Sequence, residues 1–448
     1  MPKKSLIWLA VILSLVLSLV AACGLDTTSS NKAQGTTLPS GEHLYVLDGY
    51  VPGNPGNTDN TGQSGQHIVV FHPGNSTAGM TLPNGLTSLN HRVLVSAQNG
   101  QPGHTTISIY NTQNGALVRS LSIVGAYTTS GREFNDAVLS IDGRWLALRL
   151  LSSSTSASTI ALVDTQAGTL VKTIHLSGDF DLDAISLDGN ALYLLERLHN
   201  GSGHYYVRLF NTQEHELYQT PIVDKSELND PNMTGTAIAR QEASSGAEVY
   251  TLYTDTYHHL AFVHILPLDP GFPFARCINL PAGTSPDLLR YYTLVLSADG
   301  SRLYAANAAL GIVVEISLNE QGTSNIYSDQ VVATAHFSPP ASTLTSEEQS
   351  RVLRNGAALT SDQSTLYFAG LDGIWSVKTK DLSAIHPSFT HLLAGQTITG
   401  VSLSADNRTV FAVDPARGIT MLDTATGQSE QVIQGPARNP WSIEWITN

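Results

Sequence analysis

Charged side chains are scarce in this 448-residue chain, where Lys, Arg, Asp and Glu together make up 13% of the residues. This is about half the share that is usual in soluble proteins. Basic residues are the scarcer kind, because 23 Lys and Arg stand against 37 Asp and Glu and leave a formal net charge of −14. A protein that binds DNA or RNA needs Lys and Arg to neutralise phosphates. The sequence therefore predicts no nucleic-acid partner.

Cysteine is nearly absent as well, since the chain has only Cys23 and Cys277. The sequence contains no C-x-x-C, C-x-x-C-H or H-E-x-x-H motif, so zinc and covalent haem have no support. It also lacks a G-x-S-x-G nucleophile elbow, a P-loop and a dinucleotide fingerprint. These absences favour a protein without catalysis, although they leave the question open.

The N-terminus has the order of a secretory signal. Lys3 and Lys4 precede an apolar stretch over residues 6–22, which is short for a membrane-spanning helix of about 20 residues. The run Val20-Ala-Ala-Cys23 resembles the lipobox of bacterial lipoproteins. That resemblance implies cleavage before Cys23 and attachment of diacylglycerol to its thiol. We therefore predict a signal peptide over 1–22, a flexible lipid-bearing tether over 23–42, and a location on the outer side of the cytoplasmic membrane, in the cell envelope.

One turn motif recurs along the rest of the chain. Its Asp accepts hydrogen bonds from the backbone just after it, and its final Gly or Asn tolerates positive φ. A degenerate copy stands at Ser244-Ser245-Gly246. The five clear copies are Ser140-Ile-Asp142-Gly143, Ser186-Leu-Asp188-Gly189, Ser297-Ala-Asp299-Gly300, Thr360-Ser-Asp362-Gln363 and Ser404-Ala-Asp406-Asn407.

A second turn follows about 17–23 residues later in the same repeat. Its copies begin at Asn111-Thr, Asp164-Thr, Asn211-Thr and Asp423-Thr. Strands flank both turns, so each repeat holds four strands, and no long amphipathic helix interrupts them. Four-stranded repeats of this length close radially. The sequence thus predicts an all-β fold, a single β-propeller over 43–448.

The blade count is eight, with seven left open if residues 43–82 form an irregular cap. Residues 43–82 supply only three strands of a first blade. The segment 441–446 is an unpaired strand after the last complete repeat. We expect it to complete the first blade and to close the ring, because closure removes the exposed sheet edge.

Several strand sequences carry a family resemblance. With LYVLD (44–48), LYAAN (303–307), LYFAG (366–370) and VFAVD (410–414), the chain resembles the YVTN and WD-repeat-like propellers, which are also grouped with quinoprotein-type propellers. The resemblance implies the fold and says little about activity, because propellers host many functions.

One face of the expected propeller has longer connections than the other. We call it the loop face; it carries the connections 50–66, 124–133, 152–158, 223–235, 281–290 and 338–356. The opposite turn face carries the short turns described above. Long loops are where binding residues gather, so we predict a binding site on the loop face near the channel mouth. The candidates are Arg132, Glu133, Arg197, His199, Asp224, Lys225, Asp255, Tyr257, His258, Asp287, Arg290, Arg354, Asp372, Asp414, Arg417 and Arg438.

Asp179, Asp181 and Asp183 alternate along one expected strand. Alternation places three carboxylates on one face, where a cation would relieve their repulsion. The pattern departs from a calcium loop at Ala184, where that loop needs Gly. A calcium ion is the only cofactor for which the sequence offers ligands.

Three functions fit these features. We expect a lipid-anchored, monomeric extracytoplasmic propeller that binds or scaffolds a protein, peptide or glycan through its loop face. The first alternative is a hydrolase or lyase that acts on sugars or lactones with channel-mouth carboxylates, His and Arg. The second is an accessory lipoprotein of an envelope complex, which would expose a large apolar patch.

Overall fold

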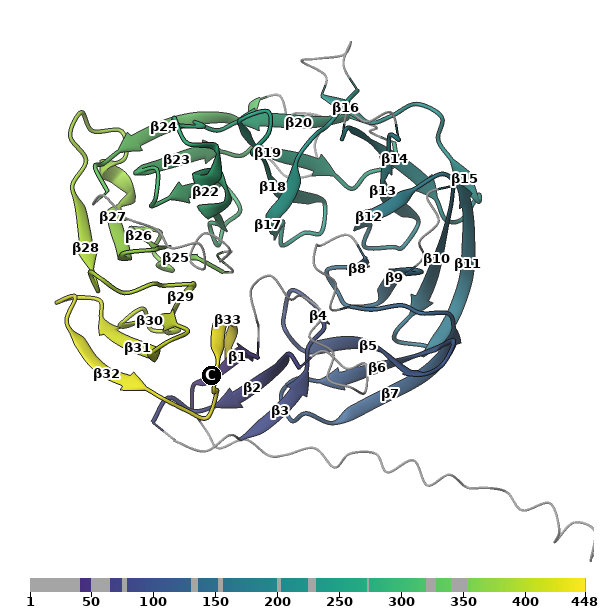
Figure 1. The fold of residues 1–448 in the computed structure, drawn as a ribbon, viewed down its shortest axis with the longest axis horizontal. Helices are drawn as coiled ribbons and strands as arrows, with labels where there is room; N and C mark the ends of the chain where they lie inside the picture. Colours follow the sequence, from purple (N-terminus) through teal and green to yellow (C-terminus); the bar gives the residue numbers. More distant parts are fainter. Residues whose placement is uncertain are drawn as a thin grey trace, which may run out of the picture. The chain divides into compact units, whose positions relative to one another are not determined.

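The structure is a computed structural model, and it describes residues 41–49, 65–74, 79–129, 136–151, 156–199, 203–224, 231–271, 274–319, 328–339, 353 and 355–447. These residues form eight sheets arranged around a common axis (Figure 1), which confirms the all-β propeller. Two short 3-10 helices, η2 (Pro286–Tyr291) and η4 (Thr379–Asp381), accompany the strands. Within the described ranges, no helix has the length and apolar character needed to cross a membrane.

The first four blades are antiparallel sheets of four strands each. In every blade the strands are given from the innermost to the outermost. Blade 1 consists of β33 (Pro440–Thr447), β1 (His43–Asp48), β2 (His67–Phe71) and β3 (Met80–Pro83). Blade 2 consists of β4 (Leu86–Thr87), β5 (Val93–Gln101), β6 (His104–Asn111) and β7 (Leu117–Val124). Blade 3 consists of β8 (Ala137–Leu139), β9 (Trp145–Arg149), β10 (Ala157–Asp164) and β11 (Thr169–Ser177). Blade 4 consists of β12 (Phe180–Ile185), β13 (Ala191–Arg197), β14 (Tyr205–Asn211) and β15 (Glu216–Leu217).

The other four blades follow the same order, except that blade 5 gains a fifth, outermost strand, β16, which pairs in parallel with β20. Blade 5 consists of β17 (Thr236–Glu242), β18 (Glu248–Asp255), β19 (Leu260–Pro267), β20 (Phe274–Asn279) and β16 (Val223–Asp224). Blade 6 consists of β21 (Tyr292–Leu296), β22 (Arg302–Asn307), β23 (Ile312–Ser317) and β24 (Gln330–His336). Blade 7 consists of β25 (Ala357–Leu359), β26 (Thr365–Gly370), β27 (Gly373–Lys378) and β28 (Phe389–Leu392). Blade 8 consists of β29 (Gly400–Leu403), β30 (Thr409–Asp414), β31 (Gly418–Asp423) and β32 (Ser429–Ile433).

The C-terminal strand closes the ring. β33 pairs antiparallel with β1, with Leu44 opposite Ile446 and Val46 opposite Ile443. The count of eight blades and the closure by this strand are both confirmed. The seven-blade alternative is wrong, because the described part of the N-terminal region supplies three regular strands of blade 1.

The repeated turns owe their geometry to the side chains that the motif specifies. In blade 3, Ser140 Oγ donates to Asp142 Oδ1 at 2.6 Å and accepts from the Trp145 N–H at 2.9 Å. Gly143 has φ of 79°, in the left-handed region that glycine adopts without strain. In blade 2, Ser88 Oγ likewise donates to Asn90 Oδ1 at 2.8 Å and accepts from the Val93 N–H at 3.1 Å. The sequence motif missed this copy because Asn and His replace Asp and Gly.

The two repeated turns are bonded to each other, which explains why they recur together. The Thr of the second turn donates its hydroxyl to the carbonyl of the left-handed residue in the first turn of the same blade. Thr165 bonds to Gly143 at 2.5 Å, and Thr212 bonds to Gly189 at 2.6 Å. The same hydrogen bond occurs in blades 2, 7 and 8, where it also holds the two turns together at the turn face.

The hydrophobic core consists of separate clusters, and each of the two described next lies between neighbouring blades. Successive residues of a buried strand point to opposite faces. In β26, Leu366 and Phe368 pack toward blade 6, while Tyr367 and Ala369 pack toward blade 8. The inner strands therefore bury both faces and read as continuous apolar runs.

Candidate functional site

A cavity of about 690 Å³ lies between the innermost strands, with walls from β4, β8, β12, β17, β21 and β33. This volume falls within the range of about 300–1,000 Å³ that is typical of small-molecule sites. Its lining includes Leu89 and Leu187 of the turn face as well as Asp136 and Thr236 of the loop face. We call this cavity the channel.

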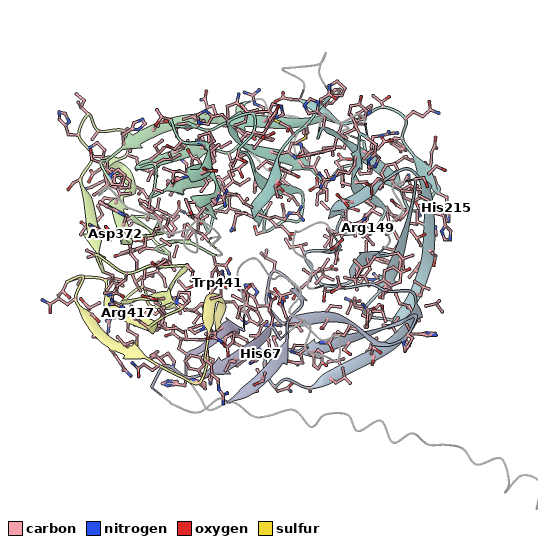
Figure 2. The ribbon with its side chains drawn as sticks, viewed as in Figure 1. His67, Arg149, His215, Asp372, Arg417 and Trp441 are labelled. Atoms are coloured by element: carbon pink, nitrogen blue, oxygen red, sulfur yellow. The ribbon has the colours of Figure 1, made fainter. Side chains whose placement is uncertain are left out.

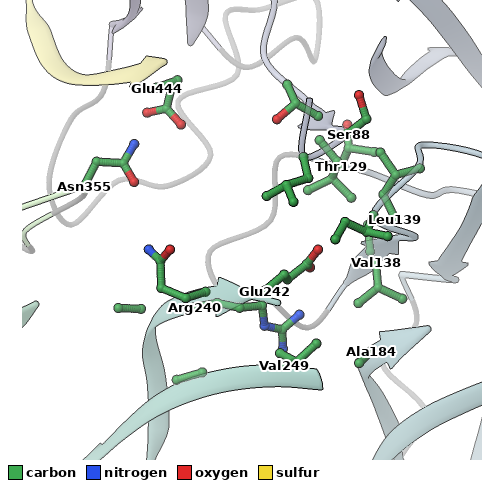
Figure 3. A pocket seen from close by; sticks show the side chains of 18 of the residues that line it. Ser88, Thr129, Val138, Leu139, Ala184, Arg240, Glu242, Val249, Asn355 and Glu444 are labelled. Carbon is green, nitrogen blue, oxygen red and sulfur yellow. The ribbon is translucent and has the colours of Figure 1, made fainter. Parts of the chain in front are cut away.

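The wall of the channel mixes apolar and polar side chains (Figure 3). Val138, Leu139 and Ala184 supply apolar surface on one side. The polar groups of the lining include Arg240, Glu242, Asn355 and Glu444, from β17, β33 and the segment before β25. Asn355 donates its amide to the Ile443 carbonyl at 3.1 Å, so its side-chain oxygen is left for a ligand. Mixed walls of this kind suit ligands with both apolar and hydrogen-bonding surface.

Among the polar groups of the channel, Glu242 has a carboxyl whose pKa is raised. Burial raises the pKa of its carboxyl, and the nearby charge of Arg240 only partly offsets this. Arg240 itself is held by Asp183, at 2.9 Å. No hydrogen bond joins the Glu242 side chain to another described residue. Its carboxyl is therefore available to exchange hydrogen bonds with a ligand.

A network of ion pairs joins blades 3 and 4 at the loop-face mouth, where its member Asp136 lines the channel. The Arg149 guanidinium lies 3.2 Å from Asp136, 3.3 Å from Asp181 and 3.9 Å from Asp179. Arg197 binds Asp181 at 2.7 Å, and His199 lies 3.1 Å from Asp179. The candidates Arg197 and His199 are thus brought together. Because each group holds another in place, the mouth is preorganised.

Arg149 and Asp136 are not among the site residues predicted from the sequence. The Arg149 N–H donates to the Asp136 carbonyl at 2.9 Å, and the Arg197 N–H donates to the Asp179 carbonyl at 2.8 Å. The two Arg–Asp sets therefore share one backbone hydrogen bond at the loop-face ends of blades 3 and 4. Arg149 lies nine residues after Ser140 and Arg197 lies eleven residues after Ser186, so an alignment of the repeats on their turns does not pair the two arginines.

The three alternating aspartates meet basic side chains in the structure. Asp179 and Asp181 belong to the network of the mouth, while Asp183 lies at an irregularity of β12, between Leu182 and Ala184, and bonds to Arg240. Alternation along the strand is interrupted there, so the three carboxylates do not align as the spacing predicted. Among the residues that the structure describes, no group of three or more His, Cys, Asp or Glu side chains is placed to hold a metal ion.

A second cluster of candidates lies at the loop-face ends of blades 4 and 5. His258 Nδ1 lies 2.7 Å from Asp255 Oδ2, and the Thr234 hydroxyl donates to the same carboxylate oxygen. Burial raises the pKa of the Asp255 carboxyl, but hydrogen bonds from Thr234 and His258 outweigh it and lower the pKa overall. The His204 ring lies 5.8 Å from the His258 ring, measured between centroids.

The neighbouring histidines of the same segment do not join this cluster. His264 is 1% exposed and belongs to the interior of blade 5. His259 points its Nε2 to the Ala282 carbonyl at 3.1 Å. Tyr257 is 89% exposed, and its ring packs against His258 with centroids 4.8 Å apart. His204 is not among the site residues predicted from the sequence, because it lies more than fifty positions before His258 in the chain.

The remaining described candidates are dispersed, and most of them cap turns. Asp372 accepts from the Gly395 N–H at 2.6 Å, and Asp414 accepts from the Ala416 N–H at 2.9 Å. Arg417 lies 3.7 Å from Asp414. Figure 2 places Arg149, Asp372 and Arg417 in three separate blades. These turn caps position the loops and do not converge on the channel.

The last candidates either form hydrogen bonds or ion pairs away from the channel or lie outside the described residues. Arg290 pairs with Asp287 within η2, at 3.6 Å. The Arg438 backbone N–H donates to Asp48 at 3.0 Å. Asp224 accepts from the Cys277 N–H at 2.7 Å. The candidates outside the described ranges are Cys23, Arg132, Glu133, Lys225 and Arg354.

The turn-face end of the channel carries apolar side chains in three neighbouring blades, together with Glu242, which ends β17 beside the turn of blade 5. Leu89 and Leu187 are 41% and 44% exposed, and they occupy the second position of their turns. Ile141 occupies the same position in the blade between them. The corresponding residues in blades 6 and 8 are the small Ala298 and Ala405. The turn-face end of the channel therefore combines apolar side chains with a carboxyl, whereas the loop-face end carries paired charges.

Comparison with known proteins supports the fold and goes no further. No protein-family model matches the chain, and no curated protein matches it. Among solved structures, dihydro-heme d1 dehydrogenase NirN in complex with DHE is 12% identical, with a TM-score of 0.51 over 93% of this chain and 79% of that chain. The periplasmic gluconolactonase PpgL of Pseudomonas aeruginosa is 14% identical, with a TM-score of 0.40 over 78% of this chain and 96% of that chain. A putative 6-phosphogluconolactonase of Bacteroides uniformis is 14% identical, with a TM-score of 0.40 over 79% and 98%.

Proposed function

We propose that this chain is a lipid-anchored extracytoplasmic binding protein whose channel holds a segment of a peptide or glycan that enters from the loop face. The observation that carries the proposal is the channel itself. Its volume of about 690 Å³ and its mixed lining are those of a binding site. We further infer that the propeller is of the YVTN, WD-repeat-like type, which the S-x-D-G turns and the LYAAN-type strands support.

The available polar groups favour a ligand with hydroxyl or amide donors. Glu242 and the side-chain oxygen of Asn355 both accept hydrogen bonds. Arg149 and Arg197 are already neutralised by Asp136 and Asp181, so the mouth offers little net charge to a strongly charged ligand. Hydroxyl groups and amide N–H groups are the donors that sugars and peptides supply.

A substitution that fills the loop-face mouth tests the proposal. Thr236 is exposed, begins β17 and lines the channel. The purified full chain is screened on peptide and glycan arrays, and the affinity for the strongest ligand is measured by fluorescence titration. Thr236→Trp is expected to weaken binding at least about tenfold, or about 1.4 kcal/mol, because the indole occupies the entrance.

The matched control is Thr390→Trp, which makes the same change at an exposed position of the outermost strand β28. It is expected to bind like the unchanged protein. Equal affinity of Thr236→Trp and the unchanged protein would place the binding surface outside the channel and contradict the proposal.

The anchor is tested at the two cysteines. Cells that produce the protein are labelled with radioactive palmitate and then separated into membrane and soluble fractions. Cys23→Ser is expected to lose the label and to leave the membrane fraction, because a lipid-modified thiol is then missing. Cys277→Ser, at a partly buried position of β20, is the matched control and is expected to keep the label. Labelling of Cys23→Ser at the original level would exclude this anchor.

A hydrolase or lyase that acts on sugars or lactones is the second candidate. The observation in its favour is Glu242, since a carboxyl with a raised pKa in a channel wall suits a general acid. The observation against it is that no described residue forms a hydrogen-bonded acid–base pair with Glu242. Turnover of a sugar lactone by the unchanged chain, lost in Glu242→Gln, would replace binding with catalysis.

A further inference from the structure

The rings of His204 and His258 lie beside each other at the loop-face ends of blades 4 and 5. Their centroids are 5.8 Å apart, and their planes are tilted by 43°. Both side chains are partly exposed, with the His258 side chain at 37%. Two imidazoles that bind one zinc ion through bonds of about 2.0–2.1 Å have ring centroids roughly 5–6 Å apart. The observed separation matches that arrangement.

His258 is oriented as a metal ligand is. The Asp255 carboxylate can only accept a hydrogen bond, so the Nδ1 of His258 carries the proton of their 2.7 Å contact. With the proton on Nδ1, a metal ion would bind His258 through Nε2. A carboxylate behind a histidine in this way fixes both tautomer and ring direction in metal sites.

The carboxylate is itself fixed by its surroundings. Asp255 also accepts from the Tyr257 N–H and the His258 N–H, each at 2.9 Å, and from the Thr234 hydroxyl. The Tyr257 ring packs at right angles to the His258 ring, with centroids 4.8 Å apart. The orientation of His258 therefore exists before any ligand arrives, which lowers the cost of binding.

We propose that His204 and His258 form a binding site for a divalent transition-metal ion of the zinc and copper class, with Asp255 as the positioning residue. Imidazole nitrogen is a preferred ligand of these ions. Water fills the remaining coordination positions. The site is separate from the channel and does not depend on the proposed function.

The test uses the purified, untagged full chain and the metal ions alone. Zinc is titrated by calorimetry, and copper(II) is added for electron paramagnetic resonance. One ion is expected to bind, and the copper spectrum is expected to show nitrogen hyperfine splitting. His204→Ala and His258→Ala are each expected to weaken zinc binding at least about tenfold, and Asp255→Asn by about 10–100-fold.

Two variants serve as matched controls. His386→Ala removes an exposed histidine of blade 7, and Cys277→Ser removes the described thiol. Both are expected to bind zinc like the unchanged chain, and thermal melting confirms that every variant is folded. Failure of the unchanged chain to bind zinc, or unchanged binding in the double variant His204→Ala/His258→Ala, would overturn the proposal.

Discussion

A chain that ends at residue 439 is expected not to fold into the closed propeller. The missing segment contains β33, the innermost strand of blade 1, with Trp441, Ile443 and Trp445 at 3%, 1% and 6% exposure. Loss of each buried aromatic side chain costs about 3–5 kcal/mol. The sum for two tryptophans reaches the whole stability of about 5–15 kcal/mol that is usual for a folded protein. Circular dichroism and size-exclusion chromatography measure the outcome.

Removal of β33 also removes contacts that blade 1 makes with its neighbouring blades. Trp445 stacks between Tyr45 of β1, at 4.3 Å, and His91 of blade 2, at 5.1 Å. The Thr399 hydroxyl, just before blade 8, donates to the Trp441 carbonyl at 2.6 Å. The strand therefore joins blade 1 to both of its neighbours.

A milder variant separates side-chain packing from loss of the strand. Trp445→Ala is expected to lower the free energy of unfolding by about 3–5 kcal/mol. Glu430→Ala, at an exposed position of the outermost strand β32, is expected to change it by less than about 0.5 kcal/mol. A truncated chain that melts cooperatively at the temperature of the full chain would show that closure by β33 is dispensable.

Arg149→Met is expected to destabilise the protein by about 3 kcal/mol, the lower end of the cost of breaking a buried ion pair. The substitution keeps much of the side-chain volume and leaves Asp136, Asp179 and Asp181 with one guanidinium fewer. Arg149 and Asp136 are only 22% and 21% exposed, so solvent screens their charges weakly. Urea unfolding at several pH values measures the loss.

The destabilisation is expected to grow with pH. Burial raises the pKa of the Asp136 carboxyl, and Arg149 offsets part of that rise. Without Arg149 the pKa in the folded state rises further. A carboxyl whose pKa is raised on folding stabilises the folded state at pH values below its ordinary pKa of 3.8. This stabilisation is lost as the pH rises through the pKa that the carboxyl has in the folded state. The difference between the variant and the unchanged protein is therefore smallest near pH 4 and increases toward neutrality.

Arg144→Met is the control for this prediction. Arg144 belongs to the same blade and pairs with Asp164 at 3.0 Å, but its side chain is 44% exposed. Exposed pairs contribute about 0–1 kcal/mol, so a small loss is expected. If Arg149→Met and Arg144→Met lower the free energy of unfolding equally, the ion-pair network at the mouth stabilises the protein no more than an exposed ion pair does.

The repeated turns could be predicted from sequence because their chemistry is local. Ser140 and Asp142 bond within two residues of each other, and Gly143 is required by its own backbone angle. The closing role of residues 441–446 could also be predicted from sequence. The first blade lacks one strand and the C-terminal segment is one strand without a blade, so pairing the two completes the ring. The blade-2 turn at Ser88 escaped notice because His91 adopts the left-handed conformation that the motif assigns to Gly or Asn.

The arrangement of the sites depended on contacts between blades. Asp181 meets Arg149 of blade 3, Asp183 meets Arg240 of blade 5, and His204 meets His258 across 54 positions of the chain. Nothing in the local sequence encodes these pairings, since they arise from the angle and spacing of neighbouring sheets. The sequence by itself determined the strands, the turns and the number of blades, because those follow from hydrogen bonds and apolar alternation within one repeat. Only the tertiary structure decided which charges neutralise each other and which groups remain for a ligand, because closing the ring brings distant strands within a few ångströms.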